Sequence, residues 1–162
     1  SVTFEPGETT TSQQHNWILF RYAEILLNYA EAMVNAYGDP DYTGSYSLSA
    51  RDAVNQVRNR GDVKMPAYPA DMSKDAFLKR LKNERRVEFA FEGQRFWDLR
   101  RWKELDDMQN IYKVKVVKQT DGTIQYTKAL HATYNIQDKM YFYPISNTEL
   151  FKNHKLVQNT GW

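Results

Sequence analysis

The chain has 162 residues, which is enough for one domain with a sizeable core. Its 22 basic and 20 acidic residues give a formal net charge of only +2, whereas nucleic-acid binders present a strongly basic face. The lack of cysteine excludes disulfides, thiolate metal sites and cysteine nucleophiles, and no apolar stretch approaches the roughly 20 residues that span a bilayer. The compositional anomaly is 14% aromatic residues. They indicate a ring-rich helical core or a surface that binds flat ligands.

The first part of the chain predicts a loop and then a helix. Residues 1–15 are polar and lack an apolar period. From about Asn16, a candidate N-cap, the chain is rich in Leu, Ala, Glu and Met up to Gly38, with Pro40 just beyond as a stop signal. Apolar residues cover most of the circumference of this helix, so we expect it to need neighbours on more than one side and the chain alone to be marginally stable.

Two further helices are predicted before residue 107. Ser49 is the expected N-cap of a short helix that Gly61 closes. Ser73 is the expected cap of a third helix, which Gly93 breaks in two.

After Asp107 the pattern changes to a β-hairpin. Two β-prone runs flank Asp121 and Gly122, the strongest short hairpin signal. With these two residues as the turn, Val117 lies opposite Tyr126.

The last part of the chain predicts an extended run and a helical turn. Residues 139–145 read as extended, and Ser146 with Glu149 has the spacing of a capping box. The fold class is therefore mainly α with a small β-hairpin. We expect one domain that is helical over 16–107, hairpin and extended over 108–143, and a turn and tail over 144–162.

Carboxylates, arginines and rings alternate in the stretch NERRVEFAFEGQRFWDLRRW. Glu88 and Glu92 are four residues apart, so on one helix their Cβ atoms lie about 5–6 Å apart, near the roughly 5–5.5 Å carboxyl separation of a retaining glycosidase. The flanking arginines instead favour a structural ion network, because cations lower carboxyl pKa values and a general acid needs a raised one. We expect both carboxylates to be buried and paired with Arg21, Arg95 and Arg101, and we predict no catalytic residue. The rings are expected to pack into neighbouring helices: Phe89, Phe91, Phe96, Trp97 and Trp102.

No other pattern indicates chemistry. His15, His131 and His154 lie apart without ligand spacing. The chain has no Gly-rich phosphate loop and no nucleophile elbow. We therefore expect no cofactor, no metal and no nucleic-acid partner.

Four stretches together resemble the SusD/RagB family. They are RYAEILLNYAEA (21–32), VNQVRNRG (54–61), NERRVEFAFEGQRFWDLRRWK (83–103) and YFYPISNTELFKNHKLVQNTGW (141–162). Their order and spacing also match. The chain departs from the family pattern at three positions in the last stretch, where Ser146 and Thr160 replace two prolines and Trp162 replaces a tyrosine.

The resemblance implies a non-catalytic, glycan-binding lipoprotein at the surface of certain Gram-negative bacteria, which caps a SusC-like TonB-dependent outer-membrane transporter. It also implies a mainly helical fold with tetratricopeptide-like helix pairs. Members are much longer, so the chain is expected to be a C-terminal portion. The part before it would carry the signal peptide, the lipidated cysteine that anchors the protein to the membrane, and most of the helix pairs.

None of the four motifs contacts sugar in the family, so we predict the glycan-binding residues from their setting. Tyr42 and Tyr46 come first and Trp17 second, because rings among Gly, Ser, Asp and Pro have few core neighbours. The alternative is a helical scaffold that binds protein rather than sugar. An exposed platform of rings would favour glycan binding, and an extended concave helical groove would favour the scaffold.

Overall fold

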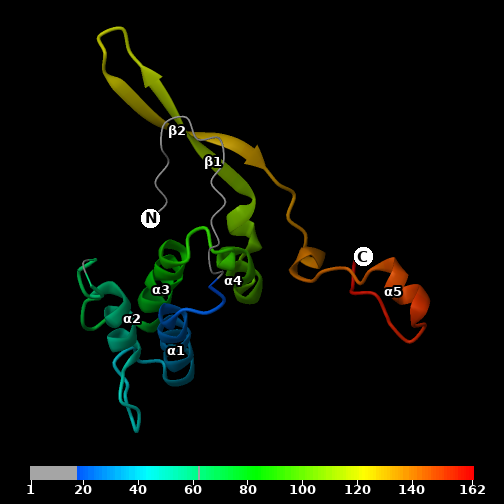
Figure 1. The fold of residues 1–162 in the computed structure, drawn as a ribbon, viewed down its shortest axis with the longest axis horizontal. Coiled ribbons are helices and arrows are strands. Elements are labelled where there is room, and N and C mark those ends of the chain that lie inside the picture. Colours follow the sequence, from blue (N-terminus) through cyan, green and yellow to red (C-terminus); the bar gives the residue numbers. More distant parts are fainter. Residues whose placement is uncertain (1–17, 62) are drawn as a thin grey trace, which may run out of the picture. The chain divides into compact units, whose positions relative to one another are not determined.

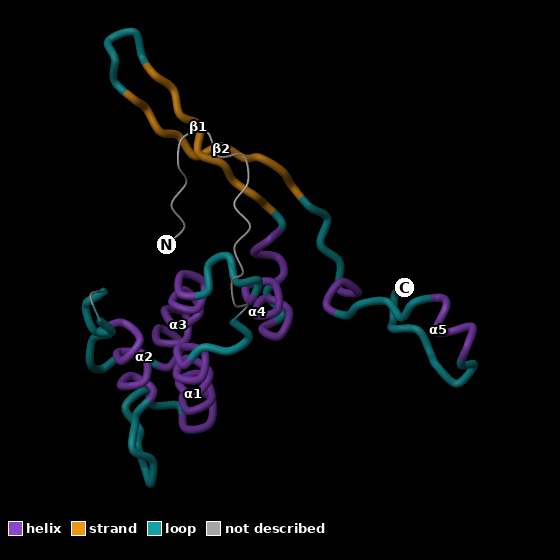
Figure 2. Tube along the Cα trace, viewed as in Figure 1, coloured by secondary structure: helices purple, strands orange, loops and turns teal. Residues whose placement is uncertain are grey.

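The computed structural model of the protein describes residues 18–61 and 63–162, in which helices predominate over one two-stranded sheet, as the sequence predicts (Figures 1 and 2). Two compact units divide the chain, residues 1–88 and 89–162. The first contains α1 (Tyr22–Tyr37), α2 (Ala50–Arg58) and α3 (Lys74–Glu88). The second contains α4 (Gln94–Trp102), a 3-10 turn η1 (Leu105–Met108), β1 (Asn110–Lys118), β2 (Ile124–Thr133), a second 3-10 turn η2 (Asp138–Tyr141) and α5 (Asn147–Lys152).

Helix α1 ends where the sequence predicts but begins later. Gly38 is left-handed (φ 78°) and its N–H donates to the carbonyl of Val34 at 2.9 Å, as a C-terminal glycine should. The N-cap is Arg21, which is extended, and residues 18–20 are not helical. Asn16, the predicted cap, lies outside the described residues. The guanidinium of Arg21 bonds to Glu88, so a tertiary contact accompanies the start of this helix.

The core of the first unit lies where α1 contacts α2 and α3 (Figure 1). Its fully buried side chains come from all three helices: Leu27 and Val34 from α1, Ala53 and Val54 from α2, and Phe77 and Leu81 from α3. Burying one such Leu or Phe side chain contributes about 1.5–3 kcal/mol. On the outer face of α1, Tyr22 and Ile25 are exposed. The expectation that this helix needs further neighbours stays a prediction.

Local capping fixes the starts of α2 and α3. Asp52 N–H donates to Ser49 Oγ at 3.1 Å while Ser49 N–H donates back to the Asp52 carboxylate at 3.2 Å, a complete capping box. At α3 the N–H of Ala76 donates to Ser73 Oγ at 3.3 Å. Both predicted N-caps are confirmed.

The break between α3 and α4 is wider than predicted. Helix α3 ends at Glu88, and α4 begins only after Gly93, which is left-handed (φ 78°). Phe91 lies between them with φ 66°, a conformation that side chains with a Cβ rarely adopt. Glu88 and Glu92 are therefore not on one helix, and the i, i+4 geometry inferred from their spacing is wrong.

The predicted hairpin is present, but its register differs by one residue. Val117 pairs with Gln125, and Tyr126 pairs with Val116. The reason is the loop, because the N–H of Gln119 donates to the carbonyl of Thr123 and encloses three residues rather than two.

The hairpin loop has the geometry of a turn followed by a left-handed residue. Gly122, at φ 84°, donates its N–H to Gln119 and supplies the left-handed position. The Asp121 carboxylate accepts from both the side chain and the backbone of Thr123, and these hydrogen bonds lower the pKa of Asp121. The Asp-Gly pair thus builds a three-residue loop.

The C-terminal segment differs from two local predictions. Residues 138–141 form the 3-10 turn η2 within what was expected to be an extended run. Helix α5 is present, but Ser146 makes no side-chain cap and Glu149 bonds to its backbone carbonyl instead (2.9 Å). The predicted capping box is therefore wrong.

The tail after α5 folds back on the segment that precedes the helix. The Gln158 carboxamide makes two bonds to the backbone of Ile145, at 2.8 and 2.9 Å. The indole N–H of Trp162 donates to the carbonyl of Lys139 at 3.0 Å. The Gln-Asn-Thr-Gly-Trp ending therefore has a structural role.

Candidate functional site

The end of α1 and the loop over residues 39–48 that follows it present a group of rings that we call the tyrosine platform: Tyr37, Tyr42 and Tyr46. The rings of Tyr37 and Tyr42 are stacked, with centroids 4.2 Å apart and planes 22° apart. Tyr46 lies 6.2 Å from Tyr37 at a tilt of 55°, and their hydroxyls are 3.2 Å apart. This hydrogen bond raises the pKa of Tyr37 above its ordinary value.

Each ring of the platform remains accessible. The exposed fractions are 44% for Tyr37, 38% for Tyr42 and 48% for Tyr46. Tyr29 supports them from α1, with its ring edge-on to Tyr46 at 6.5 Å and its hydroxyl donating to the carbonyl of Leu48 at 2.6 Å. The platform therefore offers apolar ring faces and hydroxyl groups to a ligand.

Short local bonds set the shape of the loop. The N–H of Asp41 donates to the Asp39 side chain at 2.9 Å, and the N–H of Tyr46 donates to the carbonyl of Thr43 at 2.8 Å. Gly44 has φ 52°, and a Cβ at this position would lie 2.5 Å from the hydroxyl of Tyr42. Glycine is therefore required here for the Tyr42 ring to take its place.

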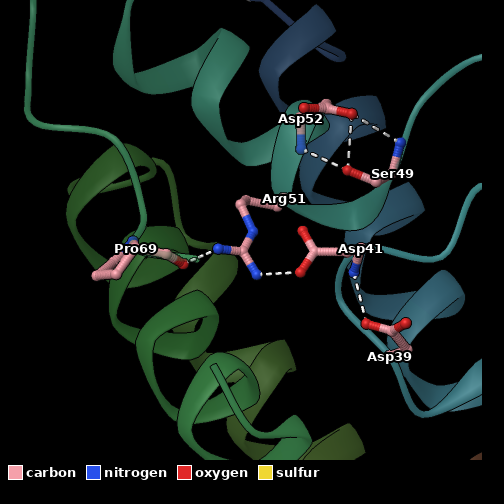
Figure 3. Close-up of polar contacts among 6 residues, drawn as sticks. All are labelled: Asp39, Asp41, Ser49, Arg51, Asp52 and Pro69. Atoms are coloured by element: carbon pink, nitrogen blue, oxygen red, sulfur yellow. Dashed lines mark hydrogen bonds and ion pairs between the residues drawn. The ribbon is translucent and has the colours of Figure 1, made fainter. Parts of the chain in front are cut away.

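Arg51 ties this loop to the body of the first unit (Figure 3). Its guanidinium is buried, and it donates both to the Asp41 carboxylate and to the carbonyl of Pro69. The backbone N–H of Arg51 also donates to the carbonyl of Pro40 at 3.0 Å. A planar guanidinium holds two partners in fixed directions, so the loop is fastened to α2 and to the connector that precedes α3.

The second concentration of polar side chains is a partly buried ion network in the first unit. One Glu88 oxygen accepts from Arg21 at 2.8 Å and from Arg60 at 2.6 Å, and Arg21 also donates to the carbonyl of Glu88 at 2.9 Å. The Glu88 side chain is only 8% exposed. Arg58 pairs with Glu84 beside it. The predicted burial of Glu88 and its pairing with Arg21 are confirmed.

The predicted burial of Glu92 is wrong. Glu92 is exposed, because α3 has ended before it. Arg95 pairs with Asp107 at 3.1 Å, and Arg101 pairs with Asp98 at 2.9 Å. Because α3 ends at Glu88, the spacing on one helix face that suggested a glycosidase pair is not present.

The rings of the same stretch are divided between core and surface. Phe89 is buried, whereas Phe91 is fully exposed (107%) and Trp97 is exposed, so their expected packing into helices is wrong. Phe91 lies in the turn between α3 and α4 rather than on a helix. Phe96 and Trp97 instead form a ring cluster with Tyr143, and Arg100 lies over Phe96 at 4.4 Å. Trp102 is half-buried.

Comparison with known proteins decides the family. The sequence matches the model of the SusD family over residues 3–162. The chain belongs to the SusD family. It is 37% identical over 90 residues to SusD-like protein P38 of Formosa agariphila, a match that covers 52% of this chain and 16% of that protein.

Solved SusD-like structures share the fold. A SusD-like protein of Bacteroides fragilis matches with a TM-score of 0.74 and 33% identity over 91% of this chain and 26% of its own. A SusD homolog of Bacteroides thetaiotaomicron matches with a TM-score of 0.64 and 25% identity over 95% of this chain and 30% of its own. The SusD-family chain thus spans less than a third of the length of these relatives.

Three of the SusD-family stretches meet in the ion network. Arg21 comes from the RYAE stretch, Arg60 from VNQVRNRG, and Glu84 and Glu88 from NERRVEF. The fourth stretch supplies the tail bonds of Gln158 and Trp162. The stretches that identify the family therefore hold the fold together, while Tyr37, Tyr42 and Tyr46 of the tyrosine platform lie outside all four of them.

The structure brings two of the three predicted site residues together. Tyr42 and Tyr46 both lie against Tyr37, and Trp17 lies outside the described residues. Tyr37 was missed, because rings within predicted helices were assigned to the core. The signal was its position, since Tyr37 is the last helical residue before Gly38 and therefore adjoins the loop.

Residues 18–61 and 63–162 bear on two other kinds of site. They hold no cluster of three or more His, Cys, Asp or Glu side chains that is suited to a metal ion. No helix in the same ranges has both the length and the apolar character to cross a membrane.

Proposed function

We propose that the tyrosine platform binds glycan, and that the chain acts within a non-catalytic protein that captures oligosaccharide or polysaccharide for uptake. The observation that carries this proposal is the arrangement of Tyr37, Tyr42 and Tyr46. Three accessible rings are fixed by stacking at 4.2 Å, by a hydroxyl contact at 3.2 Å and by the Arg51 anchor. SusD-family membership supports a role in glycan binding.

The chemistry of the platform suits a sugar. The face of a tyrosine ring is electron-rich and stacks against the C–H groups on the apolar side of a pyranose, while the phenol hydroxyl can accept or donate a hydrogen bond. Rings that are already ordered lose little conformational entropy when ligand binds. No charged side chain belongs to the platform, so we expect it to favour neutral glycans.

The direct test is calorimetric titration of the full-length gene product with neutral hexasaccharides of glucose, xylose, mannose and galactose. Tyr42→Ala removes one half of the stacked pair, and we expect it to weaken binding by about tenfold, the equivalent of roughly 1.4 kcal/mol. Tyr22→Ala is the matched control, because Tyr22 is an exposed ring on α1 outside the platform. Equal affinities for the wild type and Tyr42→Ala would contradict the proposal.

We further propose that the protein acts at the outer membrane, on the cell surface, through a lipid anchor, and hands its ligand to a SusC-like TonB-dependent transporter. Family membership supports this partner and this location. Mild detergent extraction of outer membranes followed by affinity purification of the tagged full-length protein should recover a β-barrel transporter. Recovery of the protein without any transporter would count against the partnership.

A helical scaffold for protein partners is the second candidate. It is favoured by exposed apolar side chains on α1 and in the residues just before it: Leu19, Phe20, Tyr22 and Ile25. This candidate predicts that Phe20→Ser abolishes capture of a protein partner while platform variants do not. The glycan proposal predicts that sugar affinity depends on the platform and not on Phe20.

A further inference from the structure

A groove of about 600 Å³ runs along the outer face of α2 and has no assigned role. One wall consists of polar side chains at helical spacing: Asp52, Asn55, Gln56 and Asn59. The apolar wall consists of Met65 and Ala67 from the connector, and Leu48 also lines the groove. Ligand sites typically occupy about 300–1,000 Å³, so the groove is large enough for a small ligand.

The polar wall is pre-oriented. One oxygen of the Asp52 carboxylate accepts from Ser49, and Asn55 Oδ1 accepts from the N–H of Tyr68 at 2.8 Å. These bonds fix both side chains. They leave the second Asp52 oxygen as an acceptor and the Asn55 amide N–H groups as donors, since neither has a partner among residues 18–61 and 63–162.

The apolar wall is also held in place. The N–H of Met65 donates to the carbonyl of Arg58 at 2.9 Å, and the guanidinium of Arg58 donates to the carbonyl of Pro66 at 2.7 Å. The connector therefore stays against α2. The groove combines fixed donors, a fixed acceptor and an apolar surface.

From this geometry we propose that the α2 groove binds one or two units of a neutral saccharide, as a subsite beside the tyrosine platform. A sugar hydroxyl both donates and accepts, so it satisfies an amide N–H and a carboxylate oxygen together. Asp52 disfavours an anionic ligand, and no lysine or arginine among the described residues lines the groove. A sugar ring also has an apolar side for Met65 and Ala67.

One residue joins the groove to the platform. Leu48 lines the groove, and its carbonyl accepts from the hydroxyl of Tyr29, whose ring supports Tyr46. The inference rests on the proposed function in that a bound glycan chain engages both places. An uncharged extended peptide is the competing ligand, because its backbone amides also pair with asparagine and glutamine.

The test is calorimetric titration of the full-length gene product with the neutral hexasaccharides named above and with an uncharged Ser-Ala repeat peptide. Gln56→Ala removes one polar group from the groove, and we expect affinity for the bound sugar to fall about fivefold, as for loss of a neutral hydrogen bond. Ala67→Trp fills the groove and should weaken binding further. Asn35→Ala on α1 is the matched control, an exposed amide outside the groove, and should bind as the wild type does.

The outcomes separate this inference from the proposed function. Weaker sugar binding by Gln56→Ala and Ala67→Trp, with Asn35→Ala unchanged, supports the groove even if Tyr42→Ala has no effect. Unchanged binding by both groove variants overturns the inference. The sugar affinity of Tyr42→Ala then decides the proposed function on its own. Failure of every sugar to bind the wild type overturns both. Peptide binding that the groove variants weaken, without sugar binding, assigns the groove to protein and overturns the inference.

Discussion

The tyrosine platform and the ion network lie in the same unit, but one exposes apolar side chains and the other buries charged ones. The platform keeps apolar rings at the surface, and polar ties hold them there: the Asp39 turn, the Arg51 anchor and the Tyr37–Tyr46 hydroxyl contact. The network keeps two carboxylates largely buried, and it pairs Glu88 with two arginines and Glu84 with a third. Exposed rings are available for a ligand, whereas buried charges are occupied by one another.

This difference separates the residues that identify the family from those we propose for ligand choice. The family stretches supply the network, where removing one charge leaves another uncompensated. The loop residues can vary without disturbing that network, because their ties are local and to the ends of α1 and α2. Stability and affinity should therefore depend on different side chains.

The largest expected effect comes from breaking the network. Glu88→Gln leaves Arg21 and Arg60 facing a neutral amide, and we expect the free energy of unfolding to fall by about 3 kcal/mol. The value lies at the low end for buried pairs because Arg60 is 46% exposed. Chemical denaturation of the full-length protein measures it.

Glu149→Gln is the control for this substitution. Glu149 pairs with Lys152 at a similar distance, 2.9 Å, but both side chains are mainly exposed. Exposed pairs contribute little, so the loss should stay within about 0.5 kcal/mol. Equal losses of unfolding free energy in the two variants would show that the Glu88 network stabilises the fold no more than an exposed ion pair does.

The next effect tests the platform through its glycine. Gly44→Ala places a Cβ where the Tyr42 hydroxyl lies, and we expect sugar affinity to fall severalfold, with about 1 kcal/mol lost from stability through backbone strain. Gly61→Ala has the same kind of strain (φ 46°) with nothing within 4 Å of its Cβ. It should lose similar stability and keep its affinity. If both variants bound sugar more weakly, the loss of affinity could not be attributed to displacement of the Tyr42 ring.

A smaller, pH-dependent effect comes from Tyr68, whose hydroxyl lies 3.4 Å from Glu84 of the network. Burial, and secondly the charge of Glu84, raise the pKa of Tyr68 above its ordinary value. The unfolded chain ionises this phenol near pH 10, before the folded protein does, so stability is retained below about pH 10 and falls as the pH rises further.

The matched variant for this effect is Tyr68→Phe, which cannot ionise. Between about pH 9 and 11 the wild type should lose about 1 kcal/mol more than Tyr68→Phe does. Denaturation curves at several pH values measure the difference. Parallel curves for the two proteins would mean that Tyr68 ionises equally easily in both states.

Much of the fold followed from local sequence. The Ser49 and Ser73 caps, the Gly38 terminus and the hairpin are all set by residues within a few positions of one another. The pairing of Arg21 with Glu88 was predictable because buried carboxylates need cations. The hairpin register was not, since the Asp121 side chain bonds and the left-handed Gly122 select a three-residue loop.

The candidate site was only half predictable. Tyr42 and Tyr46 stood out by their loop composition, but Tyr37 required knowing that the chain turns back over the end of α1. The role of Arg51 depends on three segments that meet only in the folded unit, at Asp41, Pro40 and Pro69. Glu92 was misplaced because a turn, and not a helix, follows Glu88.

The central claim is that affinity depends on the platform and stability on the network. Its most direct test measures both the Kd for the best hexasaccharide and the free energy of unfolding on two variants of the full-length protein. The triple variant Tyr37→Ala, Tyr42→Ala, Tyr46→Ala should lose sugar binding and keep most of its stability, because its rings are half exposed. Glu88→Gln should lose stability while its folded fraction keeps the wild-type Kd. Wild-type sugar affinity in the triple variant, or a raised Kd in folded Glu88→Gln, would contradict the account.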